Sequence, residues 1–220
     1  MVGHVSADEG RAKPRWRGVL HSYAFIVSLM MGALLISLAP PERVWVAVVY
    51  SLSLSLLFGA SALFHRVTWS ELTRRWVARL DHSMINILIA GTYTPLVVLA
   101  VSGTLATVLL AVVWGGAIGG IALHVLWIDA PKWLSASLYV LLGWTGLVAA
   151  PELETHAGRT VATLLVVGAV VYSVGALVYA FRRPDPAPTV FGYHEVFHAL
   201  VVVAATMHYA GIAMMILPAS

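Results

Sequence analysis

The chain has 220 residues, of which 60% are hydrophobic and 10% charged, with a formal net charge of +3 and a mean hydropathy of +0.88. A soluble domain carries about a quarter charged residues, so this composition excludes one and predicts an integral membrane protein. The chain has no cysteine, which excludes disulfides and thiolate metal ligands. A basic face for nucleic acid is not expected, because the positive charge lies at the flanks of apolar stretches.

Seven apolar stretches come close to the ~20 residues that a helix needs to cross a bilayer. In chain order they cover residues 17–39, 43–65, 81–101, 104–126, 132–150, 158–181 and 192–217. The first stretch is too long for the core of a signal peptide, so we expect it to be retained. The predicted fold class is an all-α membrane protein, a seven-transmembrane helix bundle, with a single domain over 17–217 after an N-terminal segment, 1–16.

The lysine and arginine residues predict how this bundle is oriented. Two of the thirteen, Arg43 and Arg159, lie on one side, and the other eleven lie opposite: Arg11, Lys13, Arg15, Arg17, Arg66, Arg74, Arg75, Arg79, Lys132, Arg182 and Arg183. The positive-inside rule therefore places the N-terminus in the cytoplasm and the C-terminus outside. We expect a multi-pass protein of the cell membrane, with membrane lipids as its surroundings.

Two segments of the third apolar stretch and its approach carry weaker signals. The polar segment 66–80 cannot span, and Thr68 and Glu71 have the spacing of a capping box, which predicts either a short interfacial helix or a solvated basic loop. Further on, Pro95 ends the run Gly91-Thr92-Tyr93-Thr94-Pro95. Proline removes a backbone hydrogen bond, so we expect a break there that either allows close packing or lines a cavity.

Polar side chains gather at the predicted cytoplasmic end of three of these helices. His65 ends the second, Asp81 opens the third, and His194 and His198 open the seventh. Ser61 lies one turn before His65, about 6 Å deeper by helical rise. Ionisable groups in membrane helices are costly and therefore indicate function. Because His194 and His198 are four residues apart on one helical face, both can bind one ion.

This convergence predicts a metal site. Three imidazoles without a thiolate favour Zn²⁺, and three ligands with an open fourth position are typical of a catalytic zinc site. Asp81 would then accept a hydrogen bond from bound water or from a ligating histidine. Each residue has a structural alternative: a helix cap for the aspartate, a backbone hydrogen bond for the serine, and an interfacial or hydrogen-bonded position for a single histidine, which we assign to His4, His124 and His156.

Other polar residues leave further alternatives open. Glu195 completes a zincin pattern between His194 and His198, in which it would be the general base of an intramembrane protease, although a carboxylate at a helix start is also stabilising by itself. His208 lies ~21 Å along the helix from His194 and cannot share the metal. His21 is the expected second-layer partner of the site, and His82 is expected to contact another helix.

Three blocks of the sequence together resemble the haemolysin-III family, the bacterial branch of a superfamily that includes adiponectin and progestin receptors and alkaline ceramidases. The blocks are Ser61-Ala62-Leu63-Phe64-His65, then Asp81-His82 leading into Ile89-Ala90-Gly91-Thr92-Tyr93-Thr94-Pro95, and His194-Glu195-Val196-Phe197-His198 with His208-Tyr209. The resemblance implies that His65, His194 and His198 ligate zinc near the cytoplasmic face. It also implies that Asp81 holds the zinc-bound water and that Ser61 supports the site.

These observations lead to one principal functional hypothesis with several alternatives. We expect a zinc-dependent hydrolase of lipid-like amides or esters, in which zinc lowers the pKa of its water, Asp81 orients that water and Ser61 stabilises the oxyanion. A membrane sensor or homeostasis protein with structural zinc is the non-enzymatic alternative. A pore-forming protein, or a transporter that relays protons through His21, His82, His124 and His208, is a further alternative.

Overall fold

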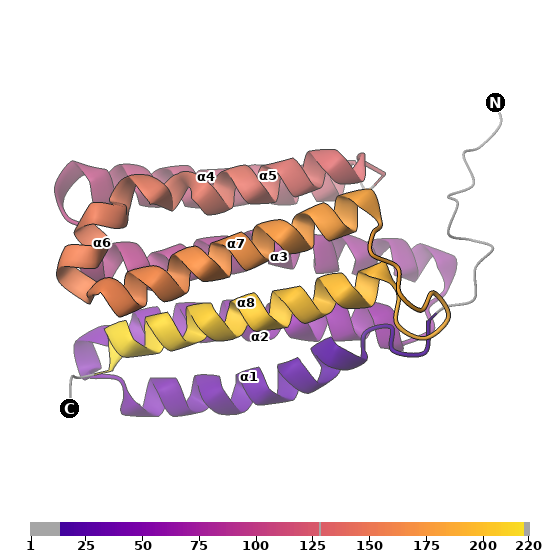
Figure 1. Ribbon diagram of the computed structural model, residues 1–220, viewed down its shortest axis with the longest axis horizontal. Coiled ribbons are helices and arrows are strands. Elements are labelled where there is room, and N and C mark those ends of the chain that lie inside the picture. Colours follow the sequence, from indigo (N-terminus) through magenta and orange to yellow (C-terminus); the bar gives the residue numbers. More distant parts are fainter. Residues whose placement is uncertain (1–13, 128, 218–220) are drawn as a thin grey trace.

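The computed structural model describes residues 14–127 and 129–217, and Figure 1 shows a bundle of long helices running along one axis. His4, Arg11 and Lys13, and most of the predicted segment 1–16, lie outside the described residues. The helices are α1 (Val19–Leu38), α2 (Val44–Arg66), α3 (Glu71–Ala100), α4 (Gly103–Leu126), α5 (Lys132–Trp144), α6 (Ala150–Ala157), α7 (Arg159–Phe181) and α8 (Tyr193–Ile216), with 3-10 turns η1 (Pro41–Arg43) and η2 (Thr145–Ala149).

Within the described ranges, seven helical stretches are long and apolar enough to cross a membrane, which confirms the predicted fold class. The fifth crossing, Trp133–Ala157, consists of α5, η2 and α6. The predicted span, 132–150, therefore ends too early, because the crossing continues through α6 to Ala157. The Tyr93 hydroxyl donates to Gly143 O at 2.6 Å and accepts from Gly146 N at 2.7 Å, so a side chain of α3 satisfies backbone groups beside the change of helix type.

Helices α2 and α3 occupy the interior of the bundle, and α1, α4 and α5 cover them. Neighbours in the sequence pack together as α1 with α2, α2 with α3, α3 with α4, and α7 with α8. Helix α8 closes the bundle because it also contacts α1 and α3. The yellow start of α8 thus lies near the indigo start of α1 in Figure 1, although the two are far apart in the sequence.

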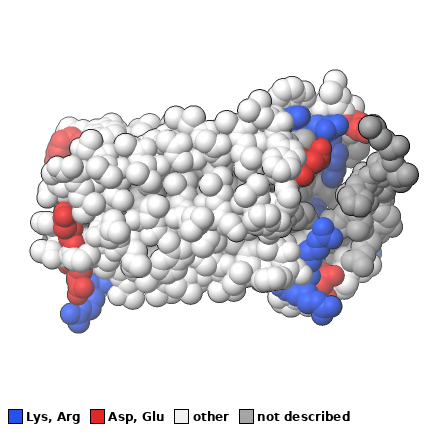
Figure 2. All heavy atoms as spheres, turned by 90° about the horizontal axis from the view of Figure 1, so that it is seen from above, with Lys and Arg blue, Asp and Glu red and all other residues white. Residues whose placement is uncertain are grey.

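The distribution of charge matches a membrane-embedded bundle. Figure 2 shows acidic and basic side chains only at the two ends of the visible face, with a broad uncharged band between them. Exposed tryptophans lie near helix ends, as an interfacial aromatic belt requires: Trp16, Trp45, Trp76, Trp127 and Trp133. The start of α1 and the end of α8 lie at opposite ends of the bundle (Figure 1). That the N-terminal end faces the cytoplasm stays a prediction.

Helix α3 differs from its prediction at its start and at Pro95. It begins at Glu71, ten residues before Asp81, and its cap is Ser70, whose Oγ accepts from Thr73 N at 3.4 Å, rather than Thr68. The expected break at Pro95 is also wrong, because the helix continues to Ala100. Thr94 Oγ1 donates to Ala90 O at 2.9 Å and so supplies a side-chain bond next to the proline.

Candidate metal centre

The end of α2 and the start of α8 bring three histidines together. One ring nitrogen from each of His65, His194 and His198 lies within 4.8 Å of the other two. His65 and His198 are buried, and His194 is partly exposed. The spacing of His194 and His198 by one turn places their ring centroids 4.4 Å apart. We call these three residues the three-histidine cluster.

The donor set of this cluster fits a zinc ion. Zn–N bonds of 2.0–2.1 Å place two tetrahedral nitrogen ligands roughly 3.3 Å apart. The Nε2 atoms of His65 and His194 are 3.1 Å apart, close to that spacing. Two facing imidazole nitrogens need either a shared proton or a cation between them, because a lone pair cannot face a lone pair. The three-histidine cluster could therefore hold a metal ion, as the sequence predicts.

Helix α1 supplies a fourth histidine directly behind the cluster. The ring of His21 stacks on His198 at a centroid distance of 3.8 Å and an interplanar angle of 1°. Its Nδ1 lies 2.7 Å from Ser61 Oγ, while its Nε2 is buried without a hydrogen-bond partner in the described part of the chain. His21 therefore fixes the orientation of the His198 ring and of the Ser61 hydroxyl.

Asp81 lies ten residues after the start of α3 and approaches the cluster from there. Its Oδ2 lies 3.9 Å from His65 Nε2, which is an ionic contact but too long for a hydrogen bond. Since α3 starts ten residues earlier, Asp81 cannot be a helix cap. The structure thus brings Asp81 next to a cluster histidine and removes its simplest structural explanation.

Glu195 is committed to structural contacts. Its Oε1 accepts from Arg17 Nε at 2.6 Å, and its Oε2 accepts from Gly192 N at 2.8 Å. The side chain is 1% exposed and does not line the cavity described below. Both oxygens therefore hold the start of α8 and the segment before α1, which favours the structural interpretation of Glu195 over a general base.

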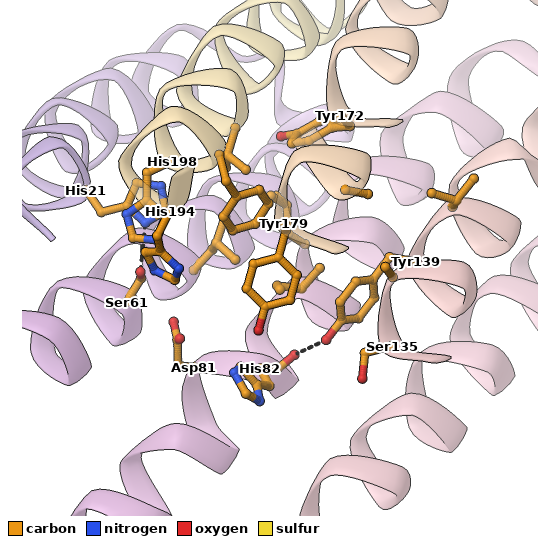
Figure 3. Close-up of a pocket in the computed structure, with 18 of the residues that line it drawn as sticks. His21, Ser61, Asp81, His82, Ser135, Tyr139, Tyr172, Tyr179, His194 and His198 are labelled. Carbon is orange, nitrogen blue, oxygen red and sulfur yellow. Dashed lines mark hydrogen bonds between the residues drawn. The ribbon is translucent and has the colours of Figure 1, made fainter. Parts of the chain in front are cut away.

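The cluster lies in the wall of a cavity of about 1200 Å³. The cavity extends from the loops around Pro14 and Asp185 to His208 inside the bundle. Its walls combine apolar residues such as Leu88, Ile89 and Val201 with the polar groups of Figure 3, where Tyr179 is drawn between His194 and His198 on one side and Tyr139 on the other. This is a large, mostly apolar space that ends at a few convergent polar groups, as ligand sites in proteins do.

Sequence reasoning missed several residues of this cavity. Tyr139 and Ser135 from α5, and Tyr179 from α7, line it, and Tyr139 Oη lies 2.7 Å from His124 Nε2. His124 is therefore a buried, hydrogen-bonded histidine, which is one of the two structural roles expected for it. Tyrosines in predicted spans were the available signal, because a buried hydroxyl needs a partner.

The remaining histidines have separate partners. His208 Nε2 bonds to Leu165 O at 3.0 Å, away from the cluster as predicted. The ring of His82 lies 5.4 Å from that of His124, which agrees with the expected contact with another helix. His156 is exposed and bonds within its own helix, to Glu152 O at 3.0 Å. None of these three joins the cluster.

Comparison with known proteins agrees with this architecture. The sequence profile of the family described as "Haemolysin-III related" matches residues 10–209. The chain belongs to this family. It is 32% identical over 154 residues to a Hemolysin-3 homolog of Bacillus subtilis (70% of this chain, 69% of the relative). It is 32% identical over 170 residues to Hemolysin-3 of Bacillus cereus (77% and 74%).

A more distant relative extends the match to nearly the whole chain. The human monocyte to macrophage differentiation factor is 26% identical over 223 residues, 96% of this chain and 90% of the relative. Together with the seven helices, these matches identify a membrane protein of the haemolysin-III family.

Proposed function

We propose that this haemolysin-III family protein is a zinc-dependent hydrolase of lipid-like amides or esters. The observation that carries the proposal is the position of the three-histidine cluster: three ring nitrogens within 4.8 Å of one another in the wall of a large cavity inside a membrane bundle. Three imidazole ligands leave one coordination position for a reactant, which a purely structural zinc site does not require.

The cavity favours a substrate with an acyl chain. Away from the cluster, the cavity is lined by apolar side chains of four helices, for example Ile85, Val140, Ala176 and Val201. Burial of each methylene group in such a space is worth ~0.8 kcal/mol, so a chain of lipid length binds well. The polar groups at one end of the cavity would then meet the carbonyl group at the end of that chain.

The chain's own residues have distinct roles in this proposal. His65, His194 and His198 would hold zinc, which when bound polarises a carbonyl oxygen and makes water a better nucleophile. Asp81, 3.9 Å from His65, would accept the proton that water loses as its oxygen adds to the carbonyl carbon. Breakage of the acyl–nitrogen or acyl–oxygen bond, with that proton passed to the leaving group, gives a fatty acid and an amine or alcohol.

Ser61 and His21 would support the reacting groups from the side of α1 and α2. The Ser61 hydroxyl is held by His21 Nδ1 at 2.7 Å, so it has a fixed direction rather than a free rotor. When His21 Nδ1 carries the proton of this contact, the hydroxyl accepts from His21, and its own proton can donate to developing negative charge without reorganising during the reaction.

A structural zinc site that joins α2 to α8 is the second candidate. The stacking of His21 on His198 favours it, because this contact adds α1 to the same junction. The structural candidate predicts that removal of metal melts the bundle, whereas the hydrolase predicts loss of turnover in a bundle that stays folded.

The deciding experiment is a hydrolysis screen with the purified full-length chain. Zinc-loaded protein in detergent or lipid nanodiscs is incubated with a panel of N-acyl amides and acyl esters, and free fatty acid is quantified. The expected result is release of fatty acid that stops on chelation and returns on addition of zinc. Absence of cleavage across the panel by protein shown to contain zinc would reject the hydrolase.

A further inference from the structure

The cavity has a second polar region, on the side formed by α4 and α5. Its side chains are His124 from α4 and Ser135 and Tyr139 from α5, and all three line the same cavity as the three-histidine cluster. We call these residues the α4–α5 polar site. Figure 3 shows Ser135 and Tyr139 across the cavity from His194 and His198, with Tyr179 between them in this view.

The hydrogen bonds of Tyr139 leave one position open. Its hydroxyl donates to the backbone carbonyl of His82 at 3.2 Å, and the same oxygen lies 2.7 Å from His124 Nε2. The hydroxyl proton is committed either to the carbonyl, with His124 Nε2–H donating to the oxygen, or to His124 Nε2, so it is not free for a ligand in either tautomer. A phenol oxygen that gives one bond and accepts one can accept one more.

Ser135 supplies a second open group. It lies one turn before Tyr139 on α5 and is only 9% exposed. Among the described residues, its Oγ has no hydrogen-bond partner, although a serine inside a helix ordinarily bonds to the carbonyl four residues earlier. A hydroxyl that lines a cavity in this way is available to a ligand or to water.

The fixed protons of the site determine what it can recognise. Tyr139 Oη can only accept a further bond, and Ser135 Oγ can donate or accept. The matching ligand group is a hydroxyl, which both donates and accepts. Neither arginine of the cavity belongs to this site: Arg17 pairs with Glu195, and Arg74 lies over the ring of Phe64. Among the side chains that the structure describes, an anionic head group therefore has no fixed counter-charge at this site.

From this geometry we infer that the α4–α5 polar site binds a hydroxyl group on the leaving part of the substrate. The inference rests on the proposed function and narrows it: the preferred substrate is an acyl amide or ester whose amine or alcohol part carries a free hydroxyl. The carbonyl lies at the three-histidine cluster, and the hydroxyl lies at Ser135 and Tyr139.

A pair of ligands tests this inference by binding alone. Dissociation constants are measured by calorimetry for an N-acyl ethanolamine and for the matching N-acyl ethylamine, which lacks only the hydroxyl. A neutral hydrogen bond contributes roughly a five- to tenfold preference for the hydroxylated ligand. We expect this preference in the wild type, and we expect Ser135→Ala and Tyr139→Phe each to bring it towards one.

The control variant is Tyr209→Phe. Tyr209 also donates its hydroxyl to a backbone carbonyl, Met31 O at 2.9 Å, but it does not line the cavity. It should keep the full preference for the hydroxylated ligand. Equal affinity of the wild type for both ligands, no binding of either, or an equal loss of both in the variants overturns the inference.

The same measurement on His65→Ala separates this inference from the hydrolase proposal. His65 does not belong to the α4–α5 polar site, so the preference for the hydroxylated ligand should survive in a variant that holds no metal. A preference without any hydrolysis would support the site and reject the catalytic function. Hydrolysis of both ligands, together with equal affinity for them, would support the hydrolase and reject the α4–α5 polar site.

Discussion

Two groups of histidines face the same cavity, and their ring nitrogens have different partners. In the three-histidine cluster, nitrogens from α2 and α8 face one another, with Nε2 of His65 and His194 3.1 Å apart. In the other group, His124 Nε2 faces the Tyr139 hydroxyl at 2.7 Å, and His82 and His124 meet only as rings 5.4 Å apart. Nitrogens directed at each other can hold a cation between them, whereas a nitrogen directed at a hydroxyl already has a hydrogen-bond partner.

The comparison predicts that only the cluster binds metal. His65→Ala and His194→Ala should lower the zinc content from about one per chain to none, since two remaining imidazoles do not hold zinc tightly. His124→Ala removes a buried histidine of the other group and should keep the full zinc content. Elemental analysis of protein purified without chelators measures this, and retained zinc in His65→Ala would break the comparison.

Asp81 tests whether the cluster is catalytic. Asp81→Asn keeps the size of the side chain but cannot accept a proton, so turnover should fall by about 100-fold or more while zinc stays bound. Asp129→Asn is the matched control, because that exposed carboxylate at the same end of the bundle has Arg75, at 3.4 Å, as its ion-pair partner among the described residues. Zinc content and fatty-acid release are measured on the same samples. A collapse of the bundle in Asp81→Asn, with normal turnover of the folded fraction, would favour a structural metal site.

Gly18 tests how tightly the cluster is held. Its φ is +78°, and a Cβ atom there would lie 2.6 Å from the Cβ of His65. Gly18→Ala should therefore displace His65 and weaken zinc binding by about tenfold or more. Gly103→Ala separates this displacement from backbone strain, because Gly103 has a φ of +60° with nothing within 4 Å. Zinc affinity from chelator competition should change in the first variant only.

Replacement of Glu195 should have the smallest effect of these changes, and it tests the protease alternative. Glu195→Gln removes the charge that pairs with Arg17 but keeps an oxygen for Gly192 N, so it should destabilise the bundle by about 2 kcal/mol. Zinc content and the activity of folded protein should not change. Thermal unfolding in detergent measures the loss. Lost activity with zinc bound and stability unchanged would instead restore the general-base interpretation of this residue.

The sequence was sufficient to predict what depends on hydrophobic length and helical period. The seven crossings follow from apolar runs, and the meeting of His65, His194 and His198 follows from their shared depth and one-turn spacing. The start of α3 was missed because residues 71–80 are too polar to resemble a span, although a helix needs no apolar side chains where it leaves the membrane. Its N-cap was assigned to Thr68, although Ser70 provides it.

Contacts between distant helices were beyond sequence reasoning. The pairing of Ser61 with His21, of Tyr139 with His124 and of Tyr93 with the α5–η2 junction depends on how helices rotate against each other. Glu195 shows the opposite error: a five-residue pattern suggested a catalytic base, but Arg17, 178 positions away, occupies the carboxylate. A motif specifies which residues are neighbours on one helix, not which partner arrives from another.

The short segment before α1 has a consequence for the architecture as a whole. Arg15 N donates to Thr189 O and Trp16 N donates to Val190 O, both at 3.1 Å. The next residue, Arg17, donates to the Glu195 carboxylate. The beginning of the first helix is thereby fastened to the beginning of the last one, so the bundle closes into a ring. A circularly permuted chain that starts at α2 and carries α1 after α8 would have to form these contacts again. A chain cut between α4 and α5 and expressed as two pieces would form them only after the two pieces assemble.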